Sequence, residues 1–323
     1  MEKKTWSPRK VVIVGAGAVG STFAYALAQS GVADEIALMD NNAELAKGQV
    51  LDLSHCLAFF PQLDLYVGSP EDYRDASIIV ITAGAKQQPG DTRISLLARN
   101  AAIMKTMAQD ISAQNSHAII IVVSNPVDIL TYILLKELGW PSGRVIGSGT
   151  VLDSARFRYM LSRYCHIDVH SIHGYILGEH GDSEFAAWSL THIAGMPINQ
   201  SSTQDGKTVD WQTAQKEIEE KVRSSAYHII DYKGATNFAI GMALVRIVTT
   251  ILRDQRSVLT VSTLLQGEYG LRDVCLSLPC VVSQQGVEQI IVGNLTENEQ
   301  HLLAHSASVL HQSYRELSSK TVK

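Results

Sequence analysis

Apolar runs and amphipathic stretches alternate along the first half of the chain. The apolar runs are short, rich in valine and isoleucine, and typical of strands that are covered on both faces. The stretches between them carry apolar residues at helical spacing. We predict strands at 10–14, 35–39, 77–82, 118–123 and 144–146, and helices at 19–29, 43–55, 94–114 and 128–138. This order predicts an α/β fold, a doubly wound parallel sheet with helices on both faces.

The pattern changes after about residue 149. We predict helices at 152–164 and 297–317, a long helical segment at 210–254 that is interrupted at Gly234, antiparallel strands at 171–177 and 185–193, and further strands at 258–265 and 281–291. Helices and strands mixed in this way are typical of an α+β domain. We therefore expect two domains, 1–148 and 149–323, with a cleft between them.

Composition narrows the classes of function. Apolar residues make up 46% and charged residues 18% of the 323 residues, which is the balance of a globular protein. The net charge of −5 and the lack of a basic stripe argue against nucleic acid as a partner. No apolar run approaches the roughly 18 residues of a membrane span, and the four cysteines form no Cys-x-x-Cys pair. We expect a cytoplasmic protein with reduced thiols and no membrane partner.

A glycine-rich segment follows the first predicted strand. Residues 15–20 read Gly-Ala-Gly-Ala-Val-Gly, and Asp40 lies 20 residues after Gly20, at the end of the next strand. Glycines permit a tight turn, so that a pyrophosphate can lie on the N-terminus of the following helix. The Asp40 carboxylate can accept hydrogen bonds from ribose hydroxyls and would repel a 2′-phosphate. The pattern predicts a Rossmann domain that binds NAD rather than NADP; a glycine-rich turn without a ligand is the alternative.

Small and polar residues also follow two later strands. Thr82, Ala83 and Gly84 end the strand at 77–82, and Ser124 and Asn125 follow the strand at 118–123. In an open α/β sheet, ligands bind beyond the carboxyl ends of the strands. The candidate NAD-binding residues are Gly15, Gly17, Ala18, Val19, Gly20, Asp40, Thr82, Ala83, Gly84, Val123, Ser124, Asn125 and Ser148.

His180 lies between glycines in a predicted loop, within the sequence Gly-Glu-His-Gly-Asp-Ser at 178–183. A histidine titrates near neutral pH and suits proton transfer to and from a hydroxyl. Asp153, near the start of a predicted helix, is a candidate to orient the imidazole and raise its pKa. Arg156 lies three residues later on the same helical face, and its planar guanidinium suits a substrate carboxylate. Spacing alone leaves a surface ion pair as the alternative for these two residues.

Six motifs, in order, resemble those of the L-lactate/malate dehydrogenase family. They are GAGAVG at 15–20, TAGAKQQPGDTR at 82–93, SNPVDILTY at 124–132, GSGTVLDSARFR at 147–158, GYILGEHGDS at 174–183 and KGATNFAIG at 233–241. The resemblance extends from about Lys10 to near the end of the chain. It implies a Rossmann domain, an α+β substrate domain, and hydride transfer between NADH and C2 of a 2-oxo acid.

The resemblance also implies roles for the site residues. His180 is expected to donate and accept the proton, with Asp153 as its partner. Arg156 is expected to bind the substrate carboxylate. Arg93 is expected to polarise the substrate carbonyl, where negative charge develops in the transition state. Because Arg93 ends the segment 85–93, which contains proline and glycine, we expect this segment to close over the substrate as a lid.

Three further residues are expected to line the substrate pocket. By the resemblance, Asn125 would form a hydrogen bond with the substrate oxygen, and Thr236 lies beside the interruption at Gly234. Malate-specific relatives carry an arginine where this chain has Gln87. A neutral glutamine leaves the second carboxylate of oxaloacetate without an ion partner, which costs several kcal/mol in a closed site. Pyruvate and L-lactate are therefore the expected substrates; malate or another 2-hydroxy acid is the alternative.

Arg158 and His173 are candidates for an effector site. In the allosteric bacterial members that this chain resembles, an arginine and a histidine at these positions, from two subunits, bind fructose 1,6-bisphosphate. A cationic pair at a symmetric interface suits a phosphate; two interfacial or exposed side chains without an effector are the alternative. The resemblance also implies a homotetramer.

A rival interpretation comes from a different class of protein. The same fold could serve a catalytically idle NAD-binding protein, since a fold does not determine a function. That interpretation predicts that at least one of the expected catalytic residues is missing, whereas His180, Asp153, Arg93 and Arg156 are all present. No metal site is predicted.

Overall fold

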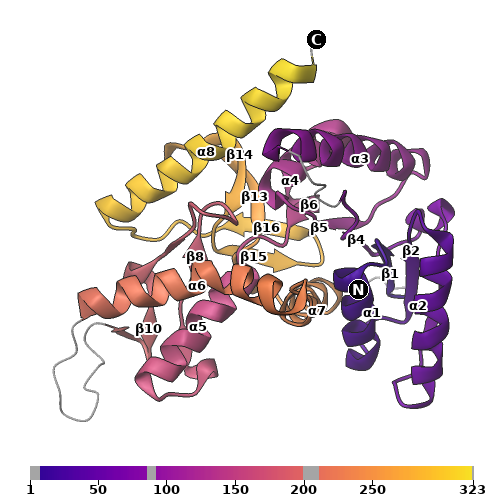
Figure 1. Cartoon of the computed structure of the whole chain (residues 1–323), viewed down its shortest axis with the longest axis horizontal. Coiled ribbons are helices and arrows are strands. Elements are labelled where there is room, and N and C mark those ends of the chain that lie inside the picture. Colours follow the sequence, from indigo (N-terminus) through magenta and orange to yellow (C-terminus); the bar gives the residue numbers. More distant parts are fainter. Residues whose placement is uncertain (1–7, 86–91, 199–210, 322–323) are drawn as a thin grey trace, which may run out of the picture.

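A twisted sheet runs through the molecule (Figure 1). The computed structural model describes residues 8–85, 92–198 and 211–321. The strands of the sheet are β1 (Lys10–Val14), β2 (Glu35–Met39), β3 (Asp64–Val67), β4 (Ile78–Ile81), β5 (Ile119–Val122), β6 (Val145–Gly147), β13 (Ser262–Gln266) and β14 (Arg272–Ser277). Their order is β14-β13-β6-β5-β4-β1-β2-β3. Strands β1 to β6 are parallel, and β13 and β14 of the C-terminal half extend the sheet in antiparallel fashion beyond β6.

The parallel strands are apolar throughout because helices cover both faces of the sheet. Successive side chains point to opposite faces. Val12 and Ile79 join a core with α3, α4 and α8, whereas Ile13 and Val80 join a core with α1, α2 and α7. These helices are α1 (Ala18–Ser30), α2 (Ala43–His55), α3 (Arg93–Ala113), α4 (Val127–Leu138), α7 (Phe238–Leu252) and α8 (Glu297–Thr321). The predicted doubly wound α/β fold is confirmed.

The C-terminal half adds an α+β layer around a third core. Phe157, Ile176 and Ile218 pack in this core, between α5, α6 and short strands. The elements are α5 (Val151–Cys165), α6 (Trp211–Lys233), β7 (Ile172–His173), β8 (Ile176–Leu177), β9 (Phe185–Ala186), β10 (His192–Ile193), β11 (Met196–Pro197), β12 (Ser257–Leu259), β15 (Cys280–Ser283) and β16 (Gly286–Ile290). Among the described residues, these strands form small sheets in the orders β11-β10-β7, β12-β15-β16 and β8-β9.

Several predicted strands were wrong in their extent. The stretch 171–177 is divided into β7 and β8 at Gly174, where a β-carbon would lie 2.9 Å from the ring of Phe157. The stretches 185–193 and 258–265 are divided in the same way. The stretch 281–291 is the hairpin of β15 and β16, which turns at Gly286 with φ +85°. Strands β3 and β14 were not predicted; β3 lies at the sheet edge and is only partly buried, so its sequence carries no long apolar run.

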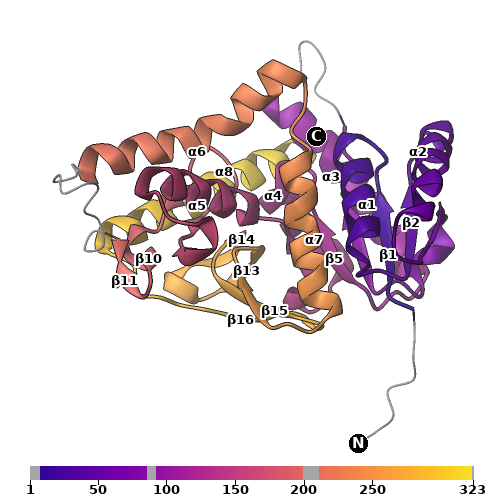
Figure 2. The ribbon, with the colours of Figure 1, turned by 90° about the horizontal axis from the view of Figure 1, so that it is seen from below.

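The predicted interruption at Gly234 is confirmed, and it joins the two halves of the molecule. Helix α6 ends at Lys233, Gly234 has φ +82°, and α7 then packs against α1 of the N-terminal half (Figure 2). The side chain of Asn237, just before α7, donates a hydrogen bond to Thr22 Oγ1 of α1 (2.8 Å). The turn between α6 and α7 is therefore fixed beside the glycine-rich segment. Within the described part of the chain, no helix is both long and apolar enough to cross a membrane.

Candidate active site

The loop that carries His180 follows β8 and is held by its main chain. Gly178 exchanges backbone hydrogen bonds of 3.0 and 2.9 Å with Ser277 of β14. The amide of the next residue donates to Ser306 Oγ of α8 (2.6 Å), and the His180 amide donates to Asp128 Oδ2 of α4 (2.8 Å). Gly178 has φ +94°, and a β-carbon there would lie 2.7 Å from Ser306 Oγ, so this position requires glycine. Two helices and a strand therefore fix the loop.

His180, Asp153 and Arg156 form one connected group. His180 Nδ1 lies 2.7 Å from Asp153 Oδ2, and Arg156 Nη1 donates to Asp153 Oδ1 at 2.8 Å. The Asp153 side chain is 2% exposed, that of Arg156 is 11% exposed and that of His180 is 27% exposed. Because Asp153 engages Nδ1, Nε2 is the ring nitrogen that can exchange a proton with a substrate.

The electrostatics of this group favour a charged imidazole. Burial would lower the pKa of His180, but the charge and hydrogen bond of Asp153, with further negative charge from Glu184 and Asp128, raise it to about 9. Burial would raise the pKa of Asp153, but His180 and Arg156 hold it below its usual range. At neutral pH the site therefore holds an ionised carboxylate beside an imidazolium, which is a proton donor.

Glu184 is a buried carboxyl beside this group that the sequence analysis did not single out. Atoms of its carboxylate, of the His180 ring and of the Asp153 carboxylate all lie within 4.8 Å of one another. Burial, with the negative charge of Asp153, raises the pKa of Glu184 to about 8. The one signal in the sequence is its position directly after the motif at 178–183. Its place in the site predicts that it influences the proton affinity of His180.

Arg93 is the first residue of α3 and not part of a loop, which corrects the expectation that it ends one. Thr92 caps this helix, since its Oγ1 accepts a hydrogen bond from the Ser95 amide (3.1 Å). The Arg93 side chain is 90% exposed, and its Nη2 lies 3.9 Å from Asp182 Oδ2, two residues beyond His180. An exposed pair at this distance is weak, so Arg93 can leave Asp182 for a substrate. Gln87, with residues 86–91 of the expected lid, lies outside the described residues.

Asn125 is exposed at the end of β5, next to a cis peptide bond with Pro126. Asn100 of α3, which the sequence analysis missed, donates from Nδ2 to the Asn125 carbonyl (2.9 Å) and accepts a hydrogen bond from the Ala85 amide (2.7 Å). Asn100 thus ties the chain before residues 86–91 to the end of β5. Thr236 is partly buried in the turn between α6 and α7.

The turn between β1 and α1 has room for a ligand at one glycine. A β-carbon on Gly20 would lie 1.8 Å from the Gly15 carbonyl oxygen, and one on Gly15 would lie 2.6 Å from Thr82 Oγ1. A β-carbon on Gly17 would meet no described atom within 4 Å. Packing therefore accounts for the outer glycines, and Gly17 leaves open space. Among the described residues no side chain caps the N-terminus of α1, so its amides are available to a pyrophosphate.

Asp40 follows β2 and supports the same turn. Its Oδ2 accepts a hydrogen bond from the Ala16 amide and its Oδ1 accepts one from the Asn42 amide, both at 2.8 Å. A carboxylate can accept about four hydrogen bonds, so Asp40 retains capacity for ribose hydroxyls. The open space at Gly17, the uncapped helix and this carboxylate together fit NAD.

The other candidate NAD-binding residues lie along the same edge of the sheet. Thr82 Oγ1 donates to the Gly15 carbonyl (3.0 Å), Ser124 Oγ donates to the Ala83 carbonyl, and the Ser148 amide donates to the Val122 carbonyl (2.8 Å). Because β1, β4, β5 and β6 are parallel neighbours, the residues after each strand meet at one edge. The structure therefore brings together the segments that hold Gly15, Gly17, Ala18, Val19, Gly20, Thr82, Ala83, Gly84, Val123, Ser124 and Ser148.

Arg158 and His173 lie on α5 and β7, which are in contact. Arg158 Nε is buried without a hydrogen-bond partner in the described part of the chain. Burial lowers the pKa of Arg158, and the positive charge of Arg246 acts in the same direction. His173 is exposed and lies directly opposite His192 of β10. The arginine is thus a half-buried cation whose Nε has capacity for an anion.

Family models match both halves of the chain. The model described as lactate/malate dehydrogenase, NAD binding domain, matches residues 9–147. The model described as lactate/malate dehydrogenase, alpha/beta C-terminal domain, matches residues 150–321.

Individual proteins match over nearly the whole chain. An L-lactate dehydrogenase of Treponema denticola is 56% identical over 96% of this chain and 98% of its own length. An L-lactate dehydrogenase of Thermoanaerobacterium saccharolyticum is 48% identical over 95% of this chain and 99% of its own length. The crystal structure of minor L-lactate dehydrogenase from Enterococcus mundtii, in the ligands-bound form, is 42% identical with a TM-score of 0.92, covering 96% of this chain and 98% of that one.

Proposed function

The chain belongs to the lactate/malate dehydrogenase family, and we propose that it is an L-lactate dehydrogenase in which His180 transfers the proton. It is an NAD-dependent oxidoreductase. The observation that carries the proposal is the connected group of His180, Asp153 and Arg156, which places a charged imidazole beside a guanidinium. A 2-oxo acid offers a carbonyl and a carboxylate on adjacent carbons, which this pair of cations complements.

The residues divide the work of pyruvate reduction. NADH, when bound at the sheet edge, supplies the hydride that C2 of pyruvate accepts. Arg156 holds the substrate carboxylate with the donors that Asp153 leaves unused, and this directs the carbonyl oxygen toward His180 Nε2. His180 donates its proton to the oxygen as negative charge develops there, and Arg93, at the start of α3, stabilises that charge. In the reverse direction, neutral His180 accepts the proton of the lactate hydroxyl.

Asp153 prepares His180 for both directions. Its hydrogen bond to Nδ1 fixes the orientation of the ring and leaves Nε2 for the substrate. Its charge stabilises the imidazolium before the proton leaves. Burial of the Asp153 carboxylate keeps water from weakening this interaction.

Pyruvate is the proposed substrate because of Gln87 and because the relatives described above are named L-lactate dehydrogenases. The test compares kcat/KM for pyruvate and for oxaloacetate with NADH. We expect a preference for pyruvate of at least about a hundredfold, since a second carboxylate would be unpaired in the closed site. A preference for oxaloacetate would contradict the assignment of the substrate.

Fructose 1,6-bisphosphate is proposed as an effector at Arg158 and His173. The buried Arg158 Nε without a partner in the described residues supports this, because a phosphate oxygen would satisfy it. A homotetramer would bring symmetric copies of this surface together. The test is a titration of the sugar bisphosphate at low pyruvate, with subunit assembly followed by sedimentation. No change in either the apparent KM for pyruvate or the assembly would argue against the effector.

The boundary between the NAD-binding domain and the substrate domain is proposed to lie between residues 148 and 149. The first family model ends at residue 147 and the second begins at residue 150, which supports this boundary.

The cytoplasm is the proposed compartment. The free thiols of Cys56, Cys165, Cys275 and Cys280 support this proposal.

A further inference from the structure

Asp128 connects the loop of His180 to the end of β5. It lies in the first turn of α4, three residues after Asn125, and its side chain is almost fully buried. Its Oδ2 accepts a hydrogen bond from the His180 amide at 2.8 Å. A single side chain thus joins two segments that are 52 residues apart in the sequence.

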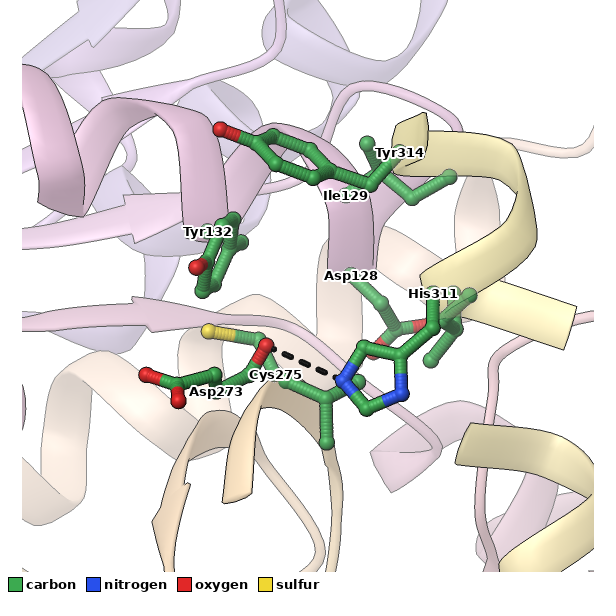
Figure 3. Close-up of a pocket in the computed structure, with 9 residues that line it drawn as sticks. Asp128, Ile129, Tyr132, Asp273, Cys275, His311 and Tyr314 are labelled. Atoms are coloured by element: carbon green, nitrogen blue, oxygen red, sulfur yellow. Dashed lines mark hydrogen bonds between the residues drawn. The ribbon is translucent and has the colours of Figure 1, made fainter. Parts of the chain in front are cut away.

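The surroundings of Asp128 do little to stabilise its charge. Asp128 lines a small pocket together with His311, Tyr132, Tyr314 and Cys275 (Figure 3). Among the described residues, Asp128 has no ion pair with a lysine or arginine, and its Oδ1 accepts no hydrogen bond that meets normal geometry. Burial raises the pKa of Asp128 to about 6, against the opposing influence of Ser262 and His180.

A carboxylate in such a place costs stability. An apolar residue of similar size would avoid the desolvation penalty of a buried ion. The one hydrogen bond within normal distance that Asp128 makes through its side chain is the bond to the His180 amide, within the described part of the chain. Local features that reduce stability are expected at functional positions. We therefore expect the function of Asp128 to lie in its hydrogen bond to the His180 amide.

We propose that Asp128 is a positioning residue that sets the distance between His180 and Asn125. The inference rests on the proposed function, in which His180 acts on the substrate oxygen, and it takes Asn125 to form a hydrogen bond with the same oxygen, as its sequence motif leads us to expect. Asn125 lies two residues before α4 begins at Val127, and Asp128 is part of the first turn of α4, so the start of this helix connects the end of β5 to the His180 amide. A displacement of about 1 Å between groups that act on one atom can cost about a hundredfold in rate.

Three variants test the role. Asp128→Ala removes the acceptor, and we expect kcat for pyruvate to fall about a hundredfold while the affinity for NADH changes less than about threefold. Asp128→Asn keeps an acceptor oxygen without the charge, and we expect it to restore kcat to within about fivefold of the parent protein. Thr131→Val is the matched control: Thr131 is buried on the same helix, and its Oγ1 bonds only to the Val127 carbonyl within α4 among the described contacts. Its kcat should stay unchanged.

The measurements are kcat, KM and NADH affinity, with circular dichroism and thermal melting to establish folding. If Asp128→Ala does not fold, Asp128→Glu takes its place, because the longer side chain displaces the amide and should lower kcat in the same way. Unchanged kcat in Asp128→Ala or Asp128→Glu would overturn the proposal. So would an Asp128→Asn variant as slow as Asp128→Ala, because the charge and not the hydrogen bond would then be at work.

A fourth variant separates this inference from the proposed function. His180→Gln should lose activity if His180 is the proton donor, whatever Asp128 does. An active His180→Gln protein would refute the proposed function itself. An inactive His180→Gln protein together with a fully active Asp128→Ala protein would refute only the role of Asp128.

Discussion

Replacing Asp153 with asparagine tests the origin of the charge on His180. The difference between an ordinary histidine pKa of about 6.5 and the value of about 9 corresponds to about 3 kcal/mol, since one pKa unit is about 1.4 kcal/mol. Without the carboxylate, burial remains and favours the neutral ring, so the pKa of His180 should fall to about 6.5 or below. Because pyruvate reduction needs the charged form, activity is present below the pKa and lost above it.

The magnitude follows from the fraction of protonated His180. At pH 8 a group with a pKa of about 9 is about nine-tenths protonated, whereas one with a pKa of about 6.5 is about 3% protonated. We therefore expect kcat/KM for pyruvate at pH 8 to fall about 30-fold in Asp153→Asn. The assay is the rate of NADH consumption at low pyruvate from about pH 5 to pH 10, which reports the pKa of the free enzyme.

A chemically matched pair on the surface provides the control. Asp168 Oδ1 lies 2.8 Å from His170 Nδ1, and both side chains are exposed. Asp168→Asn removes the same kind of contact away from the site and should leave the pH profile unchanged. If the profile of Asp153→Asn still declined near pH 9, the carboxylate would not be the cause of the raised pKa, and the reasoning would be wrong.

Three further predictions follow from the same structure. Glu184→Gln removes a negative charge beside His180, so the pH above which pyruvate reduction is lost should fall by about one unit, while the rate at pH 7 changes little. An unchanged pH profile would count against this influence of Glu184. Gly17→Ala should keep a stability within about 0.5 kcal/mol of the parent and bind NADH at least about tenfold more weakly, whereas Gly20→Ala should lose stability because its β-carbon meets a carbonyl oxygen. Equal NADH affinities of Gly17→Ala and the parent would refute the inference that the open space at Gly17 receives the cofactor. Asn100→Ala should lower the free energy of unfolding by about 1–3 kcal/mol, measured by denaturant unfolding, and should raise KM for pyruvate. If both quantities stayed unchanged, the two hydrogen bonds of Asn100 would not be needed.

The fold was largely predictable because its strands and helices differ clearly in apolar pattern. Parallel strands buried on both faces read as apolar runs, and the glycines of residues 15–20 mark the first turn. The shortest strands were not predictable in their extent. Strands β7 to β10 are two residues long, and their ends depend on tertiary contacts such as that between Gly174 and Phe157.

The site was predictable where a residue has chemistry of its own. His180, Asp153 and Arg156 became candidates because imidazole, carboxylate and guanidinium suit acid–base chemistry and carboxylate binding, but spacing alone left a surface ion pair as the alternative for Asp153 and Arg156, and their expected roles came from the family resemblance. Asp128 and Asn100 could not, because their roles are long-range hydrogen bonds to backbone groups, at separations of 52 residues for Asp128 and 25 for Asn100. Such contacts are created by the fold and leave no local pattern in the sequence.

In the proposed function, His180 gives its proton to pyruvate in the step that forms L-lactate. The most direct measurement is a single turnover, in which protein saturated with NADH is mixed with excess pyruvate and the decay of NADH and the chirality of the product are followed for the parent and for His180→Gln. We expect L-lactate as the product and a rate at least about a hundredfold lower in the variant, with NADH affinity retained. A rate in His180→Gln within a few fold of the parent, or D-lactate as the product, would contradict it.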